Sequence, residues 1–160
     1  MGSMDGKGRG TMVISNWRFW AAAFALALSP DVGADSDSLA ALRWNARPLI
    51  LVALRADDPV ALDLKARAAA ERAGFRDRRM VLVEVYPERA AIDGRPLDGD
   101  EARSLADRLD AGTGEARMVL VGLDGGAKLR TPASESLGRL FELIDGMPMR
   151  REELRERGAD

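Results

Sequence analysis

The chain has 160 residues, of which 46% are hydrophobic and 31% charged, and its formal net charge is -2. This composition is typical of a globular protein with room for one domain and its core, and the interleaved charges argue against nucleic acid as a partner. The chain contains no cysteine and no histidine, which excludes disulfides, thiol redox chemistry, Cys/His zinc sites and every nucleophile activated by histidine. We expect no cofactor and no metal ion.

The first 34 residues are expected to be an N-terminal extension and a signal peptide. Lys7, Arg9 and Arg18 lie around the start of a short apolar run, residues 19–28, and the small residues Val32-Gly33-Ala34 follow it. The apolar run is about ten residues long, whereas a membrane-spanning helix needs about twenty. We therefore expect cleavage after Ala34, a periplasmic or secreted location, and no stable membrane span in the mature protein. The alternative is an apolar first helix that packs on the domain.

Three apolar stretches predict the strands of a sheet. Residues 49–54 form a continuous apolar run, which is typical of a central parallel strand covered on both faces. Residues 80–86 predict a second strand, in which Glu84 interrupts the apolar run and indicates a less buried face or an end. Residues 118–130 predict a hairpin, because Asp124-Gly125-Gly126 supplies the positive φ that its turn requires.

Capping signals predict three helices between and after these strands. Asp58 is a good N-cap before Pro59, and this helix should end near Gly74. Residues 98–101 have the acid-x-x-Glu pattern of a capping box at the start of a second helix. A third helix should begin between Thr131 and Ser134, and Gly146 and Pro148 should end it.

Two segments are expected to lie outside these elements. Residues 87–96 contain two prolines and an Asp-Gly pair, which are typical of a loop. Residues 151–160 contain one clear apolar residue, Leu154, and are expected to form a charged helical tail that frays.

The order of elements predicts the fold of residues 35–150. The first strand, helix and second strand form a right-handed βαβ unit, and the hairpin adds one strand antiparallel to this pair and another at the edge. We expect a thioredoxin-like α/β domain, a three-layer sandwich in which helices cover both faces of a mixed four-stranded sheet. Residues 49–54 and 118–123 should be neighbours in that sheet.

Four stretches resemble an uncharacterised domain family of secreted bacterial proteins, domain of unknown function 4174: residues 46–52, 79–85, 118–130 and 144–153. The family is related to domains of the animal equarin and sushi-repeat-containing proteins. The resemblance covers most of Leu39 to Glu153, and residues 124–130 and 147–150 are its more specific parts. It implies a thioredoxin-like, peroxiredoxin-related fold, and it implies no activity.

The resemblance also indicates where a redox site would lie. Redox members of the thioredoxin fold carry thiols where the first strand meets the first helix, and a cis-proline before the hairpin. Here residues 56–60 contain no cysteine and residues 114–117 no proline, so we expect no dithiol exchange and no thiol peroxidase activity. Asp57 and Asp58 at this junction could hold a cation or a basic group, although a helix cap and its neighbour is the interpretation we favour. Two carboxylates provide too few oxygens for a calcium loop.

Other candidate binding residues lie elsewhere. Lys128 and Arg130 alternate on the predicted edge strand, where charge discourages edge-to-edge pairing and could also bind a partner. Trp44 and Tyr86 could form an exposed recognition surface, although we expect both to pack in the core or at its rim.

These observations leave two hypotheses for function. The first is an exported, non-catalytic module that binds a protein or an envelope component. The alternative is an enzyme of unknown reaction that uses carboxylates or a lysine in a cleft near Asp57 and Asp58. A concave site with a buried ionisable group at this junction would favour the enzyme. A flat apolar patch or an open sheet edge would favour the binding module.

Overall fold

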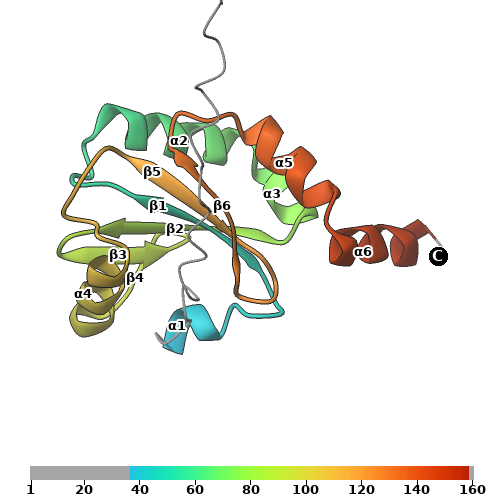
Figure 1. Cartoon of the computed structure of the whole chain (residues 1–160), viewed down its shortest axis with the longest axis horizontal. Coiled ribbons are helices and arrows are strands. Elements are labelled where there is room, and N and C mark those ends of the chain that lie inside the picture. The colour runs from blue at the N-terminus through green and yellow to red at the C-terminus, as the bar shows by residue number, and fades with distance from the viewer. Residues whose placement is uncertain (1–36, 159–160) are drawn as a thin grey trace, which may run out of the picture.

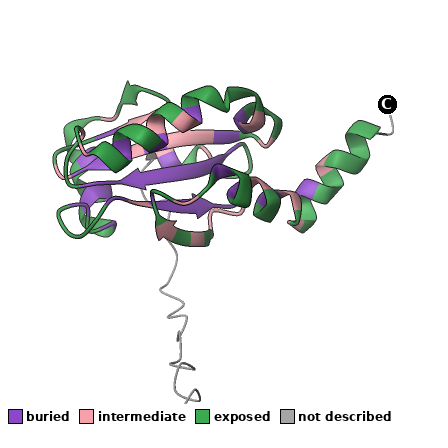
Figure 2. Ribbon diagram, turned by 90° about the horizontal axis from the view of Figure 1, so that it is seen from above, coloured by how far each residue is buried: buried purple, intermediate pink, exposed green. Residues whose placement is uncertain are grey.

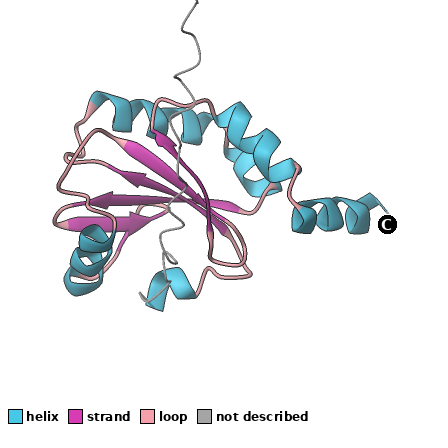
Figure 3. Cartoon of the chain, in the orientation of Figure 1, coloured by secondary structure: helices cyan, strands magenta, loops and turns pink. Residues whose placement is uncertain are grey.

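The structure, a computed structural model, describes residues 37–158 as an α/β fold with one mixed sheet between two layers of helices (Figures 1 and 3). In chain order, the elements are α1 (Asp37–Ala40), β1 (Arg47–Val52), α2 (Pro59–Ala70), α3 (Arg72–Asp77), β2 (Met80–Tyr86), β3 (Arg89–Ile92), β4 (Arg95–Pro96), α4 (Gly99–Arg108), β5 (Arg117–Val121), β6 (Ala127–Pro132), α5 (Leu137–Asp145) and α6 (Pro148–Gly158). The predicted signal peptide and the cleavage after Ala34 lie outside the described residues.

Strand β1 is the centre of the sheet. Its residues 49–52 are fully buried, as their uninterrupted apolar character predicts. The strand pairs in parallel with β2 and antiparallel with β5, so that Leu49 lies between Leu82 and Leu120. The predicted pairing of the first strand with the hairpin is therefore confirmed.

The sheet has six strands in the order β4-β3-β2-β1-β5-β6, so the prediction of four strands is wrong. The extra strands come from residues 87–96, which were predicted to form a loop. Strand β3 returns antiparallel along β2, with Tyr86 opposite Arg89. Asp93 and Gly94 then have φ angles of 46° and 77°, the pair of positive values that a tight hairpin turn requires. The chain thereby adds β4 and extends the sheet beyond β2.

Two hydrophobic cores lie on opposite faces of the sheet, because successive side chains of a strand point to opposite sides. Leu49 and Leu51 face the layer of α2, α3 and α5, where they join Leu64. Ile50 points to the opposite face, where it packs with Leu105 of α4 and Leu39 of α1. Figure 2 shows the buried strands between the partly exposed helices. Helices thus cover both faces, as predicted.

The predicted caps of α2 and α4 are present. The Asp58 carboxylate accepts hydrogen bonds from the first two N–H groups of α2, at 2.8 and 3.1 Å. Asp98 accepts hydrogen bonds from the Asp100 and Glu101 N–H groups of α4, at 3.0 and 2.9 Å. The second half of the capping box is absent. Glu101 instead accepts hydrogen bonds from the Ser38 N–H and hydroxyl, both at 2.9 Å, and so connects α1 to α4.

The third predicted helix, α5, begins later than expected. Strand β6 continues through Thr131 and Pro132, and Ser136 then caps the helix, which starts at Leu137. Gly146 ends it, as predicted. The delay follows from the hairpin, because the register of β6 against β5 extends to Pro132.

Helix α6 contains the segment expected to be a fraying tail, and ion pairs connect it to the domain. Arg150 is 1% exposed and pairs with Asp77, which also receives Arg157 at 2.7 Å. On the next turn, Glu153 accepts a hydrogen bond from Arg47 at 2.9 Å. The helix extends away from the sandwich in Figures 1 and 2, and it is anchored by charge rather than by apolar contacts.

Candidate functional site

Asp57 and Asp58 lie at the junction of β1 and α2, where the sequence predicted a candidate site. Asp57 accepts two hydrogen bonds from Arg55, at 2.8 and 2.6 Å, and both side chains are mostly exposed. The hydrogen bond from Arg55 lowers the pKa of Asp57 below its ordinary value. Asp58 caps the helix. The cap predicted for Asp58 is present, whereas Asp57 makes an exposed ion pair with Arg55.

Trp44 lies in the turn before β1 and is 55% exposed, so the expectation that it packs is wrong. Its backbone has a φ of 66° and its N–H donates to the Leu123 carbonyl at 2.7 Å, which fixes the turn against the hairpin. The guanidinium of Arg43 lies 5.5 Å from the centre of the Trp44 ring, within the range of a cation–π contact. The result is an exposed aromatic side chain with one cation beside it.

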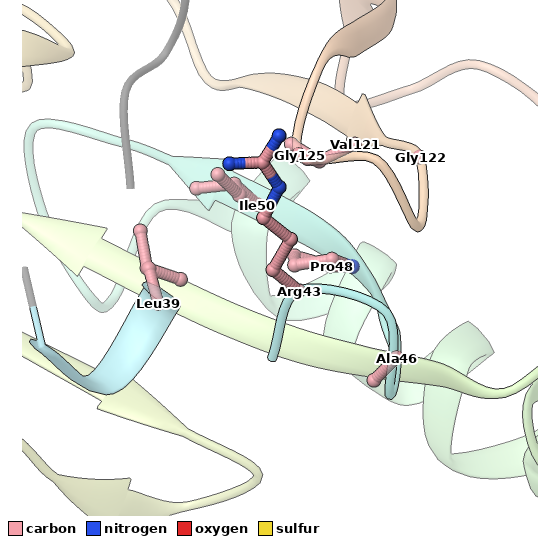
Figure 4. A pocket seen from close by; sticks show the side chains of 8 residues that line it. All are labelled: Leu39, Arg43, Ala46, Pro48, Ile50, Val121, Gly122 and Gly125. Carbon is pink, nitrogen blue, oxygen red and sulfur yellow. The ribbon is translucent and has the colours of Figure 1, made fainter. Parts of the chain in front are cut away.

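A small cavity lies behind this turn, between α1, the start of β1 and the β5–β6 hairpin (Figure 4). Arg43 lies at its mouth, with its stem against Gly125. The cavity has a volume of about 20 Å³, which is the space of one water molecule. Its lining residues are Leu39, Arg43, Ala46, Pro48, Ile50, Val121, Gly122 and Gly125. The cavity is too small for an organic ligand.

Tyr86 is buried, as expected, and lies at the opposite end of the sheet from Trp44. The first residue of β1, Arg47, pairs with Met80, whereas Tyr86 follows the pairing at the other end of that strand. The two aromatic residues therefore form no common surface. The Tyr86 hydroxyl donates to Glu84 at 2.8 Å, and Lys65 pairs with the same carboxylate at 2.8 Å. Burial, followed by this hydrogen bond, raises the pKa of Tyr86 above its ordinary value.

Lys128 and Arg130 lie on β6, the edge strand, as predicted. Lys128 donates to Asp124 at 2.6 Å, and Asp124 also accepts from the Gly126 N–H at 3.1 Å. Burial opposes ionisation of Asp124, but the hydrogen bonds from Lys128 and from the Gly126 N–H, with the charge of Lys128, together outweigh it and lower the pKa. Lys128 therefore closes the hairpin turn. Arg130 is exposed, and its side chain makes no hydrogen bond or ion pair within residues 37–158.

The largest hollow described is a groove of about 700 Å³ between helices α2 and α3 on one side and β2 with the β3–β4 turn on the other. The sequence did not predict it, because one wall requires the hairpin that was expected to be a loop. Glu84 was the one visible signal, as a carboxylate inside an apolar strand. The lining residues are Lys65, Ala68, Ala69, Arg72, Phe75, Arg76, Met80, Leu82, Glu84, Asp93 and Gly94. Neither hollow is lined by Asp57 or Asp58.

A cluster of arginines and carboxylates at the base of α6 also escaped sequence reasoning. It includes both buried charged residues of the described chain, Arg47 and Arg150. Its other members are Asp77, Arg78, Arg79, Asp145, Glu153 and Arg157. The cluster joins segments about a hundred residues apart, and guanidinium groups stay protonated at any physiological pH. Its role is to hold α6 against the domain.

Two further features are absent from residues 37–158. No group of three or more acidic side chains is placed to hold a metal ion there. None of the helices in the same part of the chain has the length and hydropathy that crossing a bilayer requires.

A family model described as Domain of unknown function (DUF4174) matches residues 38–153. The match extends from α1 into α6 and includes the groove, the edge strand and both buried arginines. No curated protein and no solved structure matches the chain. The family resemblance seen in the sequence is confirmed, whereas the relation to equarin and sushi-repeat-containing proteins stays a prediction.

Proposed function

The chain belongs to the family of the domain of unknown function DUF4174, and we propose that it is an exported, non-catalytic, thioredoxin-like module that binds a protein or an envelope component. The observation that carries this proposal is that both carboxylates at the junction between β1 and α2 already have partners within the chain. Asp57 pairs with Arg55, and Asp58 caps the N-terminus of α2. The groove beside β2 and the exposed edge strand β6 lie away from this junction. This arrangement favours the binding role over an enzyme that uses these carboxylates.

Strand order supports the thioredoxin-like part of the proposal. Strands β2, β1, β5 and β6 are adjacent in that order, with β1 and β2 parallel and β5 antiparallel to β1. Helices α2 and α5 cover one face of these strands and α4 covers the other. The β3–β4 hairpin is then an extension at one edge. Because the chain has no cysteine, such a module keeps the scaffold without the thiol chemistry.

The binding role is tested by affinity capture. The tagged full chain is expressed in a bacterium with an envelope, the envelope fraction is cross-linked, and captured proteins are identified by mass spectrometry. We expect a reproducible partner that an unrelated exported control does not capture. Absence of any enriched partner across envelope fractions would contradict the proposal.

Export and lack of redox activity have separate tests. N-terminal sequencing of the chain from the periplasm should give Asp35 as the first residue, and accumulation of the unprocessed chain in the cytoplasm would contradict export. Insulin-reduction and peroxide-consumption assays should show no turnover, because the chain has no thiol. Turnover in either assay would overturn the non-redox assignment.

A further inference from the structure

The groove between α2, α3 and β2 has the length of a short extended peptide. Its floor follows β2 from Met80 to Glu84, a rise of about 13 Å at roughly 3.3 Å per residue. An extended chain of about four residues has the same length. The helical wall includes Ala68 and Ala69, whose small side chains leave space beside the floor. The floor of the groove therefore matches an extended segment of about four residues in length.

The floor of the groove offers apolar contacts. Met80, Leu82 and Glu84 alternate along β2 and share one face of it. Phe75 and Met80 are buried, and Leu82 is half-buried, so its side chain retains exposed apolar surface. At the far end, the charge of Glu84 is compensated by Lys65 at 2.8 Å. An aliphatic side chain of a ligand can thus be covered by the middle of the floor.

Two positive charges at the groove lack partners. Arg72 and Arg76 lie one turn apart on α3 and are exposed, and their guanidinium groups make no hydrogen bond or ion pair within residues 37–158. Like charges at this spacing repel each other. Of the two carboxylates in the described lining of the groove, Glu84 pairs with Lys65, and Asp93 has no cation partner and accepts the Leu82 N–H at 3.0 Å. The groove therefore has an excess of positive charge at the end formed by α3, and guanidinium groups bind carboxylates through paired hydrogen bonds.

We propose that this groove is the docking site for an extended segment of a partner protein in which acidic and aliphatic side chains alternate. The acidic side chains pair with Arg72 and Arg76, and the aliphatic ones pack on Leu82 and its neighbours. The lining mixes charged and apolar groups along its whole length, which suits a peptide better than the uniformly apolar wall of a lipid site. This inference rests on the proposed binding function and assigns it a site and a partner chemistry.

The test is an NMR titration of the ¹⁵N-labelled full chain with the peptide acetyl-Leu-Glu-Leu-Glu-amide. We expect shift changes at the amides of Ala69, Leu82 and Gly94, and weaker or no binding of acetyl-Leu-Lys-Leu-Lys-amide. The double variant R72E/R76E should bind the acidic peptide about tenfold more weakly or less, because charge-assisted hydrogen bonds are lost. The control R139E/R151E changes the net charge equally at exposed arginines outside the groove and should bind as the wild type does.

A second pair of variants tests the groove without changing charge. Ala69→Phe fills the groove from an exposed helical position and should abolish binding. Ala70→Phe, at an exposed position about 100° further around α2 and outside the groove lining, should leave binding intact. The inference is overturned if the acidic peptide causes no shifts at millimolar concentration, if the shifts lie outside the groove, or if both Phe variants bind equally. A partner captured equally well by wild type and Ala69→Phe would keep the proposed function and overturn this site.

Discussion

Replacing Glu153 by glutamine removes the carboxylate that holds α6 on the domain. Its side chain is 15% exposed and accepts hydrogen bonds from Arg47 and Arg79, both at 2.9 Å, and from Arg150 at 3.4 Å. Arg47 is 1% exposed, and its other acceptor is the Arg78 carbonyl at 2.8 Å. Its Nε already has no partner. The substitution therefore leaves a buried guanidinium without a counter-charge.

The expected loss of stability follows from this geometry. Breaking a buried ion pair by removal of one partner costs about 3–5 kcal/mol, because the remaining charge stays buried. Arg79 is partly exposed and can be hydrated, and glutamine keeps one oxygen that accepts a hydrogen bond. We therefore expect Glu153→Gln to lower the free energy of unfolding by about 2–3 kcal/mol.

Urea unfolding measures this loss as a lower midpoint at an unchanged slope. Glu152→Gln is the matched control, because Glu152 is the neighbouring residue, is 57% exposed and pairs with Arg155. Its free energy of unfolding should lie within about 0.5 kcal/mol of the wild type. Equal stabilities of the two variants would refute the argument that the cluster anchors α6. The double variant R47M/E153M should recover much of the loss, because the buried guanidinium of Arg47 is removed together with its counter-charge, while Arg150 keeps Asp77 and Asp145.

Three further predictions concern acid, a helix cap and a tight contact. Burial opposes ionisation of Glu153, but Arg47, Arg79 and Arg150 together outweigh it and place the pKa below the ordinary 4.5. This stabilisation is complete above pH 4.5 and is lost as the pH falls through the folded-state pKa. The urea midpoint should therefore fall on acidification less steeply in Glu153→Gln than in the wild type, and identical pH profiles would contradict this. Asp58→Ala should lower the free energy of unfolding by about 1 kcal/mol, because the cap of α2 is lost, whereas Asp57→Ala should leave the urea midpoint unchanged. Equal effects of the two substitutions would show that the cap is unimportant. Gly74→Ala should lower the free energy of unfolding by about 1–2 kcal/mol, because its Cβ would lie 2.9 Å from an aromatic ring of α5. At Gly112 an added Cβ would meet no atom within 4 Å, so Gly112→Ala should leave the thermal unfolding temperature unchanged.

Local signals in the sequence were sufficient for the centre of the fold. The apolar run at residues 49–52 is buried on both faces and pairs on both sides, because a strand in that position excludes polar residues. Asp58 before Pro59 and the Asp-Gly-Gly turn are likewise short-range patterns whose physical requirement is local. The β1–β5 pairing followed from these elements and the short connections between them.

Features that depend on residues far apart in the chain could not be predicted from such short-range patterns. Strand β4 has two residues, too few for any alternation to be visible, so Asp93-Gly94 was recognised as a turn without its strands. The groove could not be predicted either, because the β3–β4 turn forms one of its walls. The ion pair between Arg47 and Glu153 joins positions 106 apart, and each residue alone looks like an ordinary surface charge. Trp44 was misjudged because its exposure depends on the turn geometry that φ of 66° imposes.

Helix α3 connects the anchoring cluster to the proposed docking groove. Gly74 lets it approach the aromatic ring of α5 closely, and Arg78, next to its last residue, donates to Asp145 at 2.6 Å. These contacts fix the helix from the side and the end that face the domain. Arg72 and Arg76 on the groove side are left without partners, although the rest of α3 is held in place. A partner segment would therefore meet a wall that is already formed, so its binding costs little ordering of the protein and its affinity depends on the contacts that the two arginines make.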